Sequence, residues 1–122
     1  MEALVGLDPE LRPRLAELAA GRALVIDYFA TVRCGGLVGD LTSDLVQQPL
    51  GAEFVPIRVL ETVPCYAERR LVPLLAQVET TIRFGGPPFA RHLAVTLDPP
   101  ERWLDFLEQG MGRARTGPRR RS

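Results

Sequence analysis

Residues 22–46, "RALVIDYFATVRCGGLVGDLTSDLV", decide the fold of this chain. The first half is rich in β-branched and aromatic residues and contains an apolar run, which is typical of a buried strand. Gly35 and Gly36 supply the positive φ angles that a two-residue hairpin turn needs. The second half returns with its leucines on one face, so the stretch predicts a hairpin. Within it, Gly39 marks either a bulge or a close approach of two backbones.

The same reading extends to both ends of the chain. Helical spacing of leucines predicts helices over about 9–20, from about Glu68 to Val78 with a kink or shortening at Pro73, and over about 99–109. Extended segments are predicted over about 54–67, 79–84 and 89–97. Strands joined by short hairpins form antiparallel sheets. We therefore predict an α+β fold: a small antiparallel sheet of about four to six strands built from hairpins, with three helices packed mainly on one face.

Length and charge divide the chain into a body and a tail. At 122 residues it has the size of one domain, and we predict a single α+β domain over 1–112. This body has ten arginines against fifteen acidic residues, a net charge of −5, whereas residues 113–122 have a charge of +5. The tail is predicted to be disordered, and to be either a solvated terminus or an arm for weak contact with nucleic acid or an acidic partner. Its arginines are Arg113, Arg115, Arg119, Arg120 and Arg121.

The amino-acid composition indicates the kind of organism that the protein comes from and limits the classes of protein to which it can belong. The chain has no lysine and no asparagine, which is typical of a bacterial genome of high GC content. No apolar run approaches the roughly 20 residues that span a bilayer, and the start lacks the features of a secretory signal, so a cytoplasmic protein without membrane contact is predicted. Cys34 and Cys65 are expected to be free thiols. Their spacing matches no CxxC pattern, so we predict no metal and no cofactor.

Three side chains are candidates for chemistry. Cys34 follows Arg33 and precedes two glycines, a setting that lowers a thiol pKa, although a free cysteine is also a small buried hydrophobe. His92 is the only histidine, and it is either a general base or a structural strand residue. Asp27 interrupts an apolar strand, where a carboxylate needs a solvated face or a partner. Arg33 and Arg91 are candidates both for pairing with Asp27 and for binding an anionic ligand.

These residues leave two hypotheses open. The sequence has no convergent catalytic set, no phosphate-binding loop and no metal-ligand spacing. This favours a non-catalytic binding or accessory protein, acting as a homo-oligomer or as a small subunit of a larger bacterial assembly. The segment "PLGAEFVPIRVLETVP" (49–64) would offer that partner a sheet edge. The alternative is a thiol-dependent enzyme or a metal or redox protein that uses Cys34 with His92 or Asp27.

Overall fold

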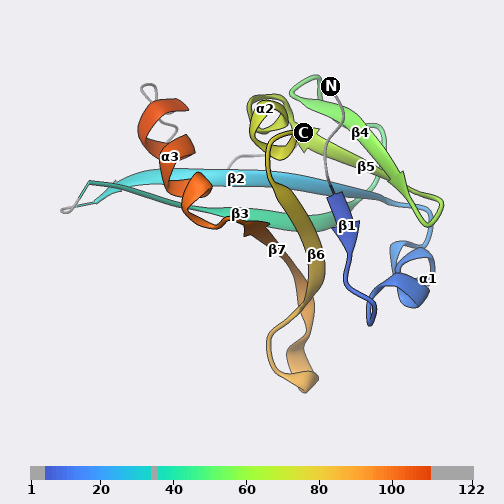
Figure 1. Cartoon of the computed structure of the whole chain (residues 1–122). Coiled ribbons are helices and arrows are strands. Elements are labelled where there is room, and N and C mark those ends of the chain that lie inside the picture. Colours follow the sequence, from blue (N-terminus) through green and yellow to red (C-terminus); the bar gives the residue numbers. More distant parts are fainter. Residues whose placement is uncertain (1–4, 34–35, 111–122) are drawn as a thin grey trace.

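The computed structural model describes residues 5–33 and 36–110 (Figure 1). Its strands are β1 (Val5–Leu7), β2 (Ala23–Arg33), β3 (Gly36–Val46), β4 (Phe54–Leu60), β5 (Val63–Glu68), β6 (Glu79–Gly85) and β7 (His92–Asp98). Its α-helices are α1 (Leu15–Ala19), α2 (Val72–Leu75) and α3 (Glu101–Gly110), and its 3₁₀ turns are η1 (Arg12–Arg14), η2 (Arg69–Leu71) and η3 (Pro88–Ala90). Cys34, Gly35 and the arginine-rich tail lie outside the described ranges.

The α+β class is confirmed, but the prediction of a purely antiparallel sheet is wrong. In the described ranges the strands form two mixed sheets, one in the order β1-β6-β7 and the other in the order β3-β2-β5-β4. The hairpins β2–β3 and β6–β7 are antiparallel as expected, and the segment predicted as extended over 54–67 forms a third antiparallel hairpin, β4–β5. In contrast, β1 pairs with β6 and β2 with β5 in parallel. Each strand of a hairpin has one edge that does not pair within that hairpin. β2 and β5 pair with each other along such edges, and β6 pairs with β1 in the same way.

The long hairpin forms one side of the four-stranded sheet, with β2 inside the sheet and β3 at its edge. Its pairing runs without interruption from Ala23 opposite Val46 to Arg33 opposite Gly36. The register has no shift at Gly39, so this glycine does not mark a bulge. A Cβ added there would lie only 3.1 Å from the Cα of Ala30 and would also meet the Phe29 carbonyl oxygen. The expected close approach of two backbones is therefore confirmed.

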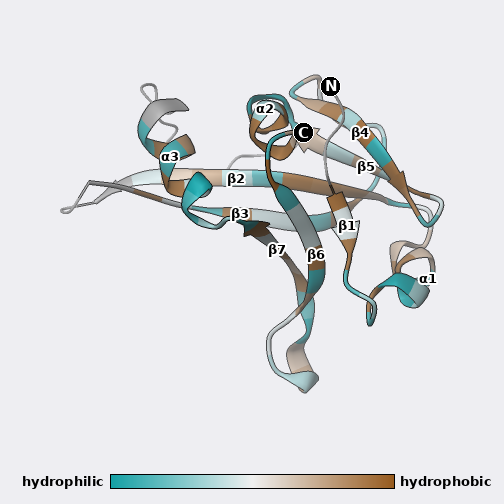
Figure 2. Ribbon diagram, in the orientation of Figure 1, coloured by the Kyte–Doolittle hydropathy of each residue, from teal (hydrophilic) through white to brown (hydrophobic). Residues whose placement is uncertain are grey.

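β2 is buried on both faces, as its apolar sequence predicts. On one face Leu24, Ile26 and Tyr28 belong to the main hydrophobic cluster, and on the other Val25 and Asp27 are also buried. Figure 2 shows hydrophobic residues along much of β2 and hydrophilic ones on the first turn of α3. α1 contacts β5, while α3 contacts β3 and β7, so the helices lie apart from one another around the sheets (Figure 1).

The first two helices are shorter than predicted because proline changes the first turn of each. η1 contains Pro13 and precedes α1, and α1 ends at Ala20 and Gly21, which both have positive φ angles. η2 leads into α2, where Pro73 is in the first turn and the Glu68 carboxylate accepts the Arg70 N–H at 2.8 Å. α3 lies close to its predicted range. β1, only three residues long, was not predicted because it is too short for a periodic pattern.

Candidate functional site

The structure separates Asp27 from His92, two of the three predicted site residues. Asp27 is buried in the middle of β2, and its carboxylate accepts the N–H of Tyr28 at 2.7 Å. His92 is exposed at the start of β7, in the other sheet. Cys34 and the side chain of Arg33 lie outside the described part of the chain. The combination of thiol, histidine and aspartate therefore stays a prediction.

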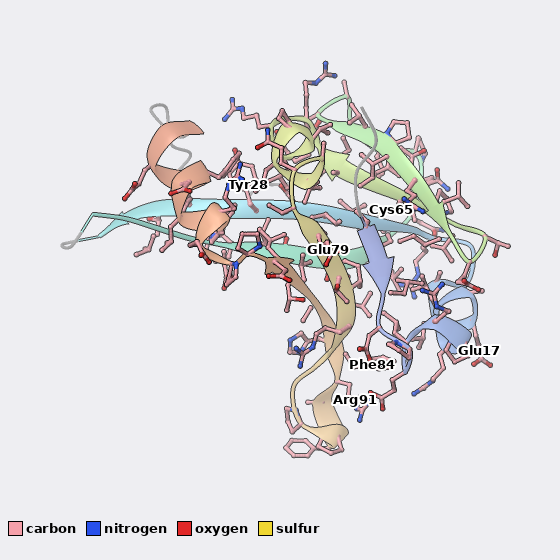
Figure 3. All side chains as sticks on the ribbon, in the orientation of Figure 1. Glu17, Tyr28, Cys65, Glu79, Phe84 and Arg91 are labelled. Atoms are coloured by element: carbon pink, nitrogen blue, oxygen red, sulfur yellow. The ribbon has the colours of Figure 1, made fainter. Side chains whose placement is uncertain are left out.

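Arg91 and His92, in contrast, line the same pocket. Arg91 pairs with Glu10, with 3.1 Å between Nη1 and Oε2, and not with Asp27. Its guanidinium also lies 5.0 Å from the centre of the Phe84 ring, where it makes a cation–π contact (Figure 3). Arg14 lies over the same ring at 5.2 Å. Two guanidinium groups therefore hold Phe84, and Arg91 is fixed next to the tip of the β6–β7 hairpin, directly after η3.

A groove runs between the edge strands β3 and β7, which lie side by side without a hydrogen-bonded ladder (Figure 1). We call it the seam groove; residues 40–44 and 92–95 line it. The Trp103 indole donates to the Gly39 carbonyl at 3.2 Å, so this carbonyl points away from β2. Alternate residues of a strand present their backbone groups to the same side. Leu41 and Ser43 therefore direct backbone groups towards the seam groove, and these groups have no hydrogen-bond partner among the described residues.

At the His92 end the seam groove adjoins a pocket of about 350 Å³, which we call the seam pocket. Its apolar wall comes from four elements or their ends: Leu18, Leu45, Phe84 and Leu93. Its polar side chains are Arg22, Ser43, Asp44, Arg91 and His92. The Ser43 hydroxyl is buried and has no hydrogen-bond partner among the residues that the structure describes. Two guanidinium groups thus face one carboxylate around an apolar wall.

Arg22 is positioned by the end of α1. Its Nε donates to the Ala19 carbonyl and its Nη2 to the Leu18 carbonyl, both at 2.9 Å. These carbonyls belong to the last turn of the helix, where intrahelical partners are missing and a cation is favoured. On the opposite side, the Asp44 carboxylate accepts the Leu45 N–H at 2.8 Å. The charged groups of the seam pocket are therefore held in place before any ligand binds.

The β6–β7 hairpin projects from the rest of the molecule and ends in η3 (Figure 1). Phe89, in η3, is 90% exposed. The tip is tightly built: the Ala90 N–H donates to the Pro87 carbonyl at 2.9 Å, and a Cβ added at Gly85 would lie 3.0 Å from the His92 ring. A large aromatic side chain is thus presented to solvent on an ordered turn.

Sequence reasoning identified Arg91 and His92 but missed Arg22, Ser43 and Phe89. No local pattern connects Arg22 and Ser43 with Arg91 and His92, which lie about seventy and about fifty residues further along the chain. For Phe89 a signal exists: an aromatic residue directly follows "GGPP", in a turn where small and polar residues are usual.

Cys65 is the free cysteine among the described residues, and it is buried, as expected of a small hydrophobe. Burial raises the pKa of its thiol to about 12, although the nearby Arg58 guanidinium opposes this rise. A thiol with so high a pKa is a poor nucleophile at neutral pH. Cys65 is therefore a structural residue rather than a reactive one.

The pKa of Cys65 predicts a loss of stability in alkali. Above about pH 9 the unfolded chain releases the thiol proton while the folded chain keeps it up to about pH 12. The free energy of unfolding should fall by about 1.4 kcal/mol per pH unit in this window through this one group. Urea unfolding of the wild type and of Cys65→Ala at several pH values measures the effect. Equal slopes against pH in the two proteins would contradict it.

Comparison with known proteins gives no family for this chain. It matches no protein-family model, and a search of the curated proteins finds no similar sequence. Within the described ranges, no group of three or more histidine, cysteine, aspartate and glutamate side chains could hold a metal ion. Among the same residues, none of the helices has the length and apolar character needed to cross a membrane.

Proposed function

We propose that this chain is a non-catalytic binding protein, acting as a homo-oligomer or as a small subunit of a larger assembly, and that the tip of the β6–β7 hairpin is its contact site. The exposure of Phe89, at 90%, carries the proposal. Aromatic residues contribute strongly to binding when a partner buries them, and they are enriched among the residues that dominate interfaces. A phenyl ring in water at a projecting tip contributes nothing to the core of its own chain.

Contacts next to the tip support this role because they limit the motion of the tip. Arg14 and Arg91 lie over the Phe84 ring, and Arg91 pairs with Glu10, which connects the hairpin to the segment before α1. A side chain that is already held in its binding position loses less conformational entropy when a partner binds. The hairpin is thus suited to insert Phe89 into an apolar pocket of another chain.

The edge of β3 offers a second contact. The outward backbone groups of Leu41 and Ser43 have no hydrogen-bond partner in the described part of the chain. An extended segment of a partner can pair with such an edge. The sequence instead predicted a partner edge in residues 49–64. Within this segment β4 is an edge strand of its sheet. It contains Pro56 with a register irregularity beside it, and both make pairing with another chain less favourable.

Replacing Phe89 with serine tests the proposal. We expect the wild type to sediment as a complex of more than one chain, or to bind a protein that co-purifies with it from its host. Phe89→Ser should weaken that complex by about thirtyfold or more, as expected of a dominant interface residue. Sedimentation velocity over a concentration series measures the change. The melting temperature should stay the same, because Phe89 supports no core contact.

Leu104→Ser is the matched control. Leu104 is 60% exposed on α3, so its replacement also removes exposed apolar surface, in a smaller amount and away from the hairpin. This variant should associate like the wild type. A wild type that is monomeric and binds no protein would refute the proposal, as would equal weakening by Phe89→Ser and Leu104→Ser.

A further inference from the structure

The seam pocket combines features of a ligand site, and Phe89, the residue that carries the proposed protein contact, does not line it. Its apolar wall is formed by Leu18, Leu45, Phe84 and Leu93, all of which are only partly buried where they pack against the core. These side chains come from segments far apart in the sequence and converge on one hollow. A volume of about 350 Å³ is at the lower end of the range for small-molecule pockets and suits a ligand of one ring or a short chain.

The charges around the wall favour an anionic ligand. Arg22 and Arg91 each retain N–H donors beyond those that bind the α1 carbonyls and Glu10. Guanidinium groups bind carboxylates through strong, charge-assisted hydrogen bonds. Asp44 is the opposing carboxylate, and it would repel a second negative charge on a ligand. The pocket therefore suits one negative charge better than two and repels a cation through its arginines.

Ser43 adds a polar group on the β3 side. Its hydroxyl has no hydrogen-bond partner in the described ranges, and buried hydroxyls without partners are rare. Ser43 lines the seam pocket, so its hydroxyl is a candidate hydrogen-bond partner for a ligand oxygen. From these observations we propose that the seam pocket binds a small organic monocarboxylate with a compact apolar body. The proposal stands independently of the protein contact through Phe89.

Benzoate and its neutral analogue benzamide test the proposal in the full chain at constant ionic strength. Titration followed by ¹⁵N–¹H NMR should shift amides of Ser43, Leu45 and Leu93. We expect benzoate to bind about tenfold or more tightly than benzamide, because only the carboxylate uses the guanidinium groups. Equal affinity for the two probes, or shifts that map away from the seam pocket, would overturn the proposal.

Variants separate the pocket from the general charge of the protein. Arg91→Gln should remove the preference for benzoate, while Arg83→Gln, at an exposed position of β6 outside the pocket, should leave it unchanged. Ser43→Ala is a small change that cannot strain the sheet, and it should weaken benzoate binding by about threefold. Its NMR spectrum shows whether the fold is intact. If Arg83→Gln weakens binding as much as Arg91→Gln, or if Ser43→Ala and Arg91→Gln both bind like the wild type, the assignment is wrong.

Discussion

Replacing Tyr28 with alanine is expected to lower the free energy of unfolding by about 3–5 kcal/mol. Tyr28 is 1% exposed, and its ring makes edge contacts with Trp103 and Phe106, at centroid distances of 6.1 Å and 5.5 Å. Trp103 and Phe106 in turn stack on each other at 5.3 Å. Removal of the Tyr28 ring leaves a cavity between β2 and α3, and both the burial and the aromatic contacts are lost.

Trp103 is the only tryptophan of the chain, so its fluorescence reports on this cluster directly. Urea unfolding gives the change in stability, and the emission of the folded variant should move to longer wavelength because water reaches the indole. Tyr28→Phe is the control: it keeps the ring and removes only a hydroxyl that Arg70 contacts at 3.5 Å, so it should cost about 1 kcal/mol or less. A Tyr28→Ala variant as stable as Tyr28→Phe would mean that α3 does not depend on this contact.

Gly39→Ala is expected to destabilise the protein by about 2–3 kcal/mol. The added methyl group would meet the Phe29 carbonyl oxygen and would lie 3.2 Å from the Cβ of Ala30. Part of this contact is with backbone, which cannot move aside like the end of a flexible side chain. The β2–β3 ladder must therefore shift locally, and the hydrogen bond from Trp103 to the Gly39 carbonyl is disturbed with it.

Gly6→Ala provides the matched control for this substitution. Gly6 is also a strand glycine, in β1, but a Cβ added there meets nothing within 4 Å. Its replacement should change stability by no more than about 0.5 kcal/mol. Thermal and urea unfolding of both variants distinguish a steric effect at Gly39 from a general effect of removing glycine. Similar losses in the two variants would show that close backbone approach is not the cause.

The seam pocket illustrates why sequence gives only part of a site. Arg91 and His92 were singled out because charged and imidazole side chains are few and chemically distinct. Arg22 and Ser43 join them only because β3 and β7, the edges of two different sheets, lie side by side. That arrangement depends on packing between the sheets, which no spacing within one segment expresses.

The sequence by itself determined the local elements of this protein. Alternation, β-branched residues and turn glycines specify the hairpins, because pairing of neighbouring strands needs only short-range contacts and suitable φ angles. It also predicted that β2 is buried and that Gly39 marks either a bulge or a close approach, and the structure decided for the close approach. Only the tertiary structure decided the parallel pairs β1–β6 and β2–β5, the division into two sheets and the seam between β3 and β7. These three features depend on which free strand edges and apolar faces fit together after the hairpins have formed. Such contacts join residues that are far apart in the chain, so no local pattern predicts them.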